Sequence, residues 1–135
     1  MLLPHAAAAT ATVPGLEEDG EDRKIDSRPN ALLLFNPVFD NGPGGFGYER
    51  VKTRYRDISP LHNLRKGVPP TIVFLGTRDR LVPVKTAQAY KQKMEQLGSR
   101  CDLFLYEGQP HGFFNRSRSP KHFVKTVTEM DRFLI

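Results

Sequence analysis

The sequence has one cysteine, Cys101, among its 135 residues, and it has no long uninterrupted apolar run. A single cysteine excludes an internal disulfide, so we expect Cys101 to pack as a small apolar side chain. No run approaches the ~18 apolar residues that a membrane-spanning helix needs. The opening residues, MLLPHAAAATATVPG, contain a short apolar core but lack the positive charges with which signal peptides begin. These features leave the localisation of the protein undetermined.

Metal-ligand patterns are absent from the sequence as well. The chain has four histidines, at positions 5, 62, 111 and 122, and their spacing is not that of metal ligands. Cys101 has no second cysteine that would complete a zinc site. We therefore expect the protein to work without a metal or another cofactor.

Charge is unevenly distributed along the chain. The formal net charge is +5, but residues 17–26, EEDGEDRKID, hold six acidic and two basic residues, so that segment carries −4 and the remainder +9. The basic residues are scattered along helix-like segments without clustered aromatic side chains, so we expect no nucleic-acid partner. With 39% hydrophobic residues, a chain of this length suits one domain with a modest core.

Three short apolar runs predict the strands of a sheet. They lie at residues 31–36, 71–76 and 101–107, and turn-forming residues flank them. The first two are continuous rather than alternating, which is typical of parallel strands covered on both faces. The third contains Asp102, which favours a place near a sheet edge. Since the first run is as apolar as an interior strand, we expect it to need a neighbouring strand that this chain does not supply.

Helical patterns lie between and after these runs. Residues 84–97 place apolar side chains at helical spacing between Pro83 and a stop at Gly98. Ser119 and Pro120 predict the N-cap and first turn of a closing helix. Strands that alternate with helices indicate an α/β fold.

Polar loops follow each predicted strand, and two of them carry residues that can take part in acid–base chemistry. The carboxyl ends of parallel strands lie at one rim of a sheet, where α/β proteins bind ligands. Asp79 follows the second strand and His111 the third, so the two side chains can meet. A carboxylate bonded to one imidazole nitrogen leaves the other nitrogen free to take a proton from a nucleophile. The alternative is that Asp79 caps a turn and His111 is an ordinary loop histidine.

The loop after the first strand is rich in glycine and proline. It runs from Asn36 to Tyr48, NPVFDNGPGGFGY. By its place after a strand it belongs to the same rim, although it can equally be a long connector.

Two motifs in this order resemble a known family. PPTIVFLGTRDRLVPV, followed by LFLYEGQPHGFFN, is similar to the C-terminal part of α/β-hydrolase-fold serine hydrolases, especially the esterase, lipase-like and prolyl-oligopeptidase-like branch. That family presents its triad in the chain order serine, acid, histidine. The resemblance implies that Asp79 is the triad acid and His111 the general base. It also implies a partial α/β-hydrolase fold with about three parallel strands and flanking helices.

The nucleophile of such a triad is missing from this sequence. No G-x-S-x-G occurs, and none of the five serines lies at a strand-to-helix turn. HAAAAT, near the start, resembles the helix that follows the nucleophile in the family. We therefore expect an incomplete, truncated hydrolase domain over residues 1–135, with a helix remnant at 1–13, an acidic linker at 14–29 and the C-terminal half of the sheet at 30–135.

The resemblance implies an activity for an intact relative rather than for this chain. The expected substrate is a small-molecule ester or an acylated saccharide, and peptide bonds are the second choice because the same core serves both. We expect this chain alone to be inactive and to self-associate through an exposed sheet edge. The alternative is a non-catalytic remnant or binding module that uses its basic face or that edge.

Overall fold

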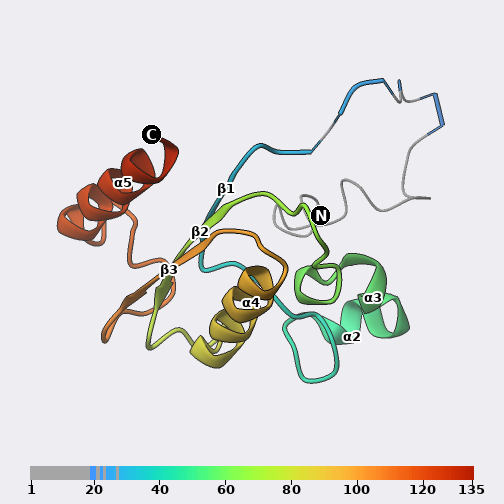
Figure 1. Ribbon diagram of the computed structural model, residues 1–135. Coiled ribbons are helices and arrows are strands. Elements are labelled where there is room, and N and C mark those ends of the chain that lie inside the picture. Colours follow the sequence, from blue (N-terminus) through green and yellow to red (C-terminus); the bar gives the residue numbers. More distant parts are fainter. Residues whose placement is uncertain (1–18, 21, 23, 27) are drawn as a thin grey trace.

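The computed structural model describes residues 19–20, 22, 24–26 and 28–135 (Figure 1). The helix expected over residues 1–13, and part of the acidic segment 14–29, lie outside the described residues. In the described part, three parallel strands form one sheet with helices on both sides. This is the α/β architecture that the sequence predicts.

The sheet is built from β1 (Leu32–Phe35), β2 (Thr71–Gly76) and β3 (Cys101–Tyr106), in that spatial order. Leu32 pairs with Thr71, and Phe74 pairs with both Phe35 and Phe104. The three predicted strands are confirmed, with ends that differ by at most one residue. All six residues of the central strand β2 are buried, as the unbroken apolar run predicts. β3 is an edge strand, in agreement with the presence of Asp102.

The free edge of β1 has no partner strand among the described residues. Its other edge pairs with β2: Leu32 and Asn36 donate their N–H groups to the carbonyl oxygens of Pro70 and Phe74 at 2.9 Å each. Main-chain groups alternate in direction along a strand, so the N–H groups of the intervening positions point away from β2. The apolar first strand thus offers an unpaired edge.

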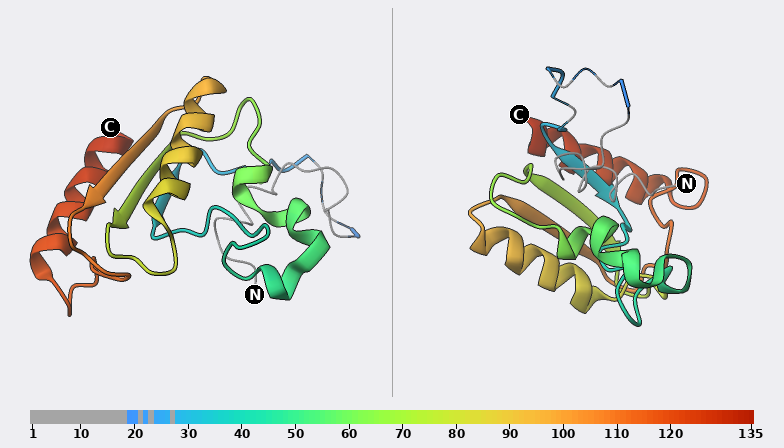
Figure 2. Two further views of the ribbon diagram at one scale, coloured as in Figure 1. Left: turned by 90° about the horizontal axis from the view of Figure 1, so that it is seen from below. Right: turned by 90° about the vertical axis from the view of Figure 1, so that its right-hand side faces the viewer.

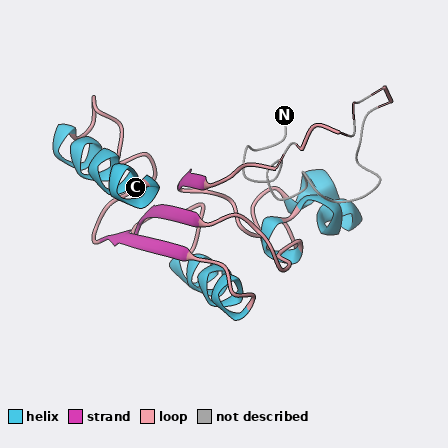
Figure 3. Cartoon of the chain, turned by 45° about the horizontal axis from the view of Figure 1, so that its top comes forward, coloured by secondary structure: helices cyan, strands magenta, loops and turns pink. Residues whose placement is uncertain are grey.

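Two longer helices cover opposite faces of the sheet. α4 (Val84–Gln96) connects β2 to β3, and α5 (Pro120–Leu134) follows β3. Figures 2 and 3 show the strands between these two helices. On the α4 face, alternate strand residues pack with Ala87, Tyr90 and Met94. On the α5 face, a second cluster forms around Phe74, Phe113 and Phe133.

The start of α5 confirms the capping prediction, and the helix buries only some of its apolar side chains. Ser119 is the N-cap residue and its side chain accepts a hydrogen bond from the His122 N–H, with Pro120 in the first turn. However, the exposed fraction of Val124 is 61% and that of Val127 is 41%. Phe133 and Thr126 are the buried residues of the helix. Part of the apolar surface of α5 therefore lies away from the sheet.

Four short helical segments lie beside the sheet, in the connection from β1 to β2 (Figure 1). They are α2 (Tyr48–Val51), η1 (Lys52–Arg54), α3 (Tyr55–Ile58) and η2 (Pro60–His62). Lys93 of α4 donates a hydrogen bond to the Leu61 carbonyl at 2.9 Å, which ties this group to the main layer. No helix in the described part is both long and apolar enough to cross a membrane.

Candidate active site

The loops that follow β2 and β3 are joined directly to each other. Thr77 Oγ1 accepts a hydrogen bond from Gly108 N at 2.8 Å, and Arg78 N donates to the Gln109 carbonyl at 3.0 Å. A Cβ atom at Gly76 would lie 2.1 Å from that same carbonyl oxygen. Glycine at the end of β2 therefore lets the loop carrying His111 approach the loop carrying Asp79.

The carboxylate of Asp79 is fixed by three hydrogen bonds. Its Oδ1 accepts from the N–H groups of Leu81 at 2.8 Å and Val82 at 3.1 Å. Its Oδ2 lies 2.8 Å from His111 Nδ1. The side chain of Asp79 has no exposed surface. The carboxylate is thus oriented by its own loop before any ligand arrives.

His111 is held by the turn around it while its ring faces solvent. Gly112 has a φ of 74°, a left-handed conformation that glycine adopts readily. Phe113 is 2% exposed and packs on the ring of Tyr106, with centroids 4.6 Å apart. Arg118 donates to the His111 carbonyl at 3.0 Å. The His111 side chain itself is 48% exposed, so one side of an anchored imidazole is accessible.

The contact between the two residues determines the chemistry that the imidazole can perform. An ionised carboxylate only accepts hydrogen bonds, so Nδ1 of His111 carries the proton in the bond to Asp79. In the neutral ring, Nε2 then has a free lone pair and can accept a proton. No serine of the described part hydrogen-bonds the His111 ring. The sequence prediction that Asp79 and His111 meet on one rim is therefore matched by the geometry, and their catalytic roles remain a proposal.

A mostly apolar pocket of about 390 Å³ lies beside His111 and along the free edge of β1. Its wall includes Val38 and Phe46 from the glycine-rich loop and Leu81 from the loop of Asp79. The exposed fractions of Phe46 and Leu81, 40% and 47%, are high for large apolar side chains. The loop over residues 36–48, which the sequence left open as rim or connector, therefore forms part of the rim.

Sequence reasoning did not identify Asn36 as a site residue. Asn36 follows β1, lines the same pocket as His111 and has a left-handed backbone with φ 43°. The sequence does contain a signal for it, because a polar residue directly follows an apolar strand and precedes a proline.

A second group of serine, histidine and aspartate lies in the described part, but it is not a nucleophilic site. The Nδ1 atom of His62 is 2.9 Å from Ser59 Oγ and 3.7 Å from Asp40 Oδ1. Ser59 is completely buried, and its Oγ also accepts a hydrogen bond from Asn41 N at 3.0 Å. The group therefore fastens the glycine-rich loop to the short helices.

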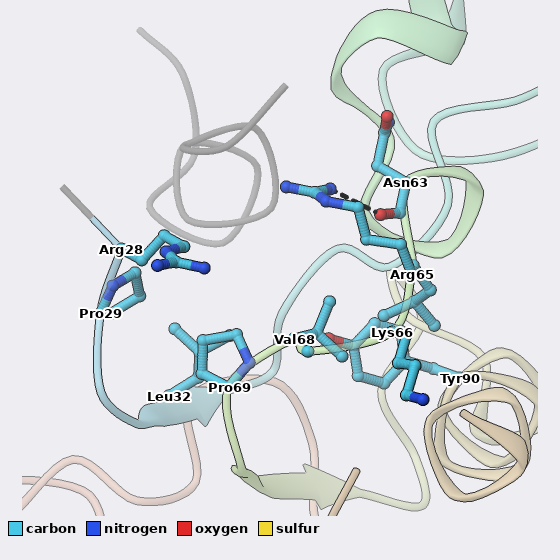
Figure 4. Close-up of a pocket in the computed structure, with 11 residues that line it drawn as sticks. Arg28, Pro29, Leu32, Asn63, Arg65, Lys66, Val68, Pro69 and Tyr90 are labelled. Atoms are coloured by element: carbon cyan, nitrogen blue, oxygen red, sulfur yellow. Dashed lines mark hydrogen bonds between the residues drawn. The ribbon is translucent and has the colours of Figure 1, made fainter. Parts of the chain in front are cut away.

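Another pocket lies at the opposite end of the sheet, next to the amino ends of β1 and β2 (Figure 4). Arg28, Arg65 and Lys66 contribute to it, and Arg65 donates to the Asn63 carbonyl at 3.0 Å. Its described lining contains neither an acidic residue nor a histidine. It therefore offers no acid–base pair and is not the candidate active site.

Comparison with known proteins identifies the family. The model of the family described as "alpha/beta hydrolase fold" matches residues 46–115, which include both Asp79 and His111. This chain belongs to the α/β-hydrolase-fold family.

Esterases are among the individual proteins to which the chain is similar. The structure of Thermogutta terrifontis esterase 2 phosphoramylated by tabun has 43% sequence identity and a TM-score of 0.85, and the match covers 96% of this chain and 50% of that one. The apo form of the same esterase has 41% identity and a TM-score of 0.84, and the match again covers 96% of this chain and 50% of that one. Esterase LipC of Mycobacterium tuberculosis is 26% identical over 96 residues, which are 70% of this chain and 23% of LipC. The chain thus spans about half the length of these solved esterase chains and less of LipC.

Proposed function

We propose that Asp79 and His111 form the acid–base half of a Ser–His–Asp site that hydrolyses small-molecule carboxylic esters. The nucleophilic serine comes from outside the 135 residues, because no G-x-S-x-G occurs within them. The observation that carries the proposal is the 2.8 Å contact between a buried carboxylate and a half-exposed imidazole beside an apolar pocket.

The proposed reaction assigns one task to each group. Nε2 of His111 takes the proton of the serine hydroxyl as its oxygen attacks the ester carbonyl carbon, and the ring becomes an imidazolium. Asp79 stabilises that cation and keeps Nδ1 protonated throughout. His111 then gives the proton to the departing alkoxide, and an acyl-enzyme forms. Water attacks the acyl-enzyme with the same base, and the carboxylic acid and the free serine result.

The substrate proposed for this site is an ester with a short acyl chain. Two structures of Thermogutta terrifontis esterase 2, 40% and 39% identical to this chain, are described as propionate bound and butyrate bound. The side chains that line the space beside His111, such as Val38, Phe46 and Leu81, are apolar and suit an aliphatic acyl group better than a charged one.

A hybrid enzyme tests this function. The whole 135-residue chain would replace the half of Thermogutta terrifontis esterase 2 that it matches, and hydrolysis of p-nitrophenyl acetate, butyrate and a matching p-nitroanilide would be measured. We expect ester hydrolysis well above anilide hydrolysis. His111→Ala should lower kcat at least about 1,000-fold, and Asp79→Asn about 100- to 10,000-fold.

A matched variant controls for folding in this experiment. Asp102 pairs with Arg100 on the edge strand β3, away from the contact between Asp79 and His111. Asp102→Asn should keep kcat within about threefold of the unmodified hybrid. A folded hybrid in which His111→Ala hydrolyses esters as fast as the unmodified protein would favour a non-catalytic binding role instead.

A further inference from the structure

Asn36 has a buried side chain whose polar atoms lack partners. It is 5% exposed, and neither its Nδ2 nor its Oδ1 has a hydrogen-bond partner within the described structure. Buried amide groups in proteins are nearly always hydrogen-bonded, because an unpaired donor or acceptor has lost water without compensation. An unpaired buried amide therefore indicates a missing partner.

The backbone at Asn36 is unusual too. Its φ of 43° is left-handed, and Pro37 follows, although a residue before proline prefers an extended conformation. Its N–H donates to the Phe74 carbonyl at 2.9 Å, which fixes the residue at the end of β1. Asparagine tolerates this conformation better than most residues, but glycine tolerates it better still. The backbone alone therefore does not explain the presence of a carboxamide.

The position of Asn36 points to the region where a nucleophile must lie. Asn36 lines the pocket that His111 also lines, and this pocket runs along the unpaired edge of β1. A serine that gives its proton to His111 has to enter this region, together with the main chain that carries it. Asn36 lies beside that path.

The hydrogen-bonding chemistry of the carboxamide distinguishes between two possible partners, an ester substrate and a main-chain segment. The Nδ2 group donates and the Oδ1 atom accepts, so full satisfaction needs one acceptor and one donor. An ester substrate has only acceptor oxygens and would leave Oδ1 unpaired. A main-chain peptide segment offers a carbonyl oxygen and an N–H group, which satisfy both atoms.

We propose that the Asn36 carboxamide hydrogen-bonds the main chain of the turn that carries the nucleophilic serine. This inference rests on the proposed function, since it assumes a serine that serves His111. Asn36 is then a positioning residue that sets the height of the serine hydroxyl relative to Nε2 of His111. A misplacement of about 1 Å at such a site lowers the rate about 100-fold.

Two substitutions at Asn36 in the hybrid enzyme separate its amide from its backbone. Asn36→Ala removes the amide and strains the left-handed backbone, whereas Asn36→Gly removes the amide and relieves that strain. We expect both to lower kcat for p-nitrophenyl acetate about 10- to 100-fold, with KM within about twofold. The pH profile of kcat should not shift, because Asn36 does not titrate. Thermal melting should show that the Asn36→Gly hybrid is folded.

The other outcomes would overturn the inference. Full activity of Asn36→Gly beside an impaired Asn36→Ala would mean that only the backbone conformation matters. A raised KM with unchanged kcat would place the amide on the substrate. Neither result would affect the proposed function, which fails instead if the folded hybrid with Asn36 intact shows no activity that depends on His111.

Discussion

Asp79 and His111, which contact each other, are held in place in different ways. Asp79 is locked by the N–H groups of Leu81 and Val82, while His111 is anchored through its main chain and keeps an accessible ring. An oriented acid beside an exposed base is the arrangement in which an imidazole can change protonation without moving. The pair is thus preorganised in the chain itself.

The tautomer of His111 is the first residue-scale prediction. In the 135-residue chain, we expect the neutral ring to carry its proton on Nδ1, because the Asp79 carboxylate can only accept. In Asp79→Asn, the side-chain NH₂ group can face Nδ1, and the proton should move to Nε2. ¹⁵N chemical shifts of the ring, recorded at a pH where His111 is neutral, distinguish the tautomers. The same tautomer in both proteins would refute the assignment.

The Cys101 thiol gives a second residue-scale prediction. It is 3% exposed, and burial raises its pKa from 9.0 to about 11. The folded chain therefore retains a proton that the unfolded chain releases, so this contribution to stability is full below pH 9 and is lost as the pH rises toward 11. We expect iodoacetamide to react with the native thiol far more slowly at pH 8.5 than with the urea-unfolded chain. Equal rates would contradict the described burial.

At the scale of elements, the junction between the second and third strands decides the geometry of the site. Gly76 ends β2 against the Gln109 carbonyl. Two hydrogen bonds, from Gly108 N to Thr77 Oγ1 and from Arg78 N to the Gln109 carbonyl, join the loop of His111 to the loop of Asp79. Most of the elements themselves could be predicted from sequence, because unbroken apolar runs and the Ser119–Pro120 cap are local signals. The close approach at Gly76 could not, because it depends on a residue distant in the sequence.

The site shows the same division between local and long-range information. The contact between Asp79 and His111 was predictable from motifs that follow strands. Asn36 was not, since its missing hydrogen bonds appear only when the surroundings are known. The exposure of Val124 and Val127 on α5 was not predictable either, because apolar spacing predicts a helix but does not say which side chains meet the sheet.

A substitution at Gly76 tests this junction. In Gly76→Ala the new Cβ would lie 2.1 Å from the Gln109 oxygen, so the two loops must separate. We expect a loss of about 1 to 3 kcal/mol in the free energy of unfolding and a weakened contact between Asp79 and His111. Gly108→Ala is the control, because its Cβ would meet nothing within 4 Å and only its φ of 71° is strained. Urea denaturation measures the free energy of unfolding of both variants. A smaller loss for Gly76→Ala than for Gly108→Ala would contradict the steric argument.

At the scale of the whole molecule, β1 has an edge without a partner strand among the described residues, and α5 has exposed apolar side chains. An apolar strand with a free edge is a template for pairing with another chain. We therefore expect the purified 135-residue chain to self-associate, with a light-scattering mass that rises with concentration and with binding of a hydrophobic dye. A monodisperse monomer that melts sharply and binds no dye would show that the β1 edge is covered.

The most direct test of the central claim is whether His111 and Asp79 activate a serine. One solved structure shows Thermogutta terrifontis esterase 2 phosphorylated by paraoxon, and this reagent would be added to the hybrid enzyme in excess. We predict a burst of one p-nitrophenol per molecule and a matching mass increase on a serine, about 100-fold slower or more in Asp79→Asn and absent in His111→Ala. A burst of equal rate in His111→Ala would contradict the account, because the serine would then react without the base that this chain supplies.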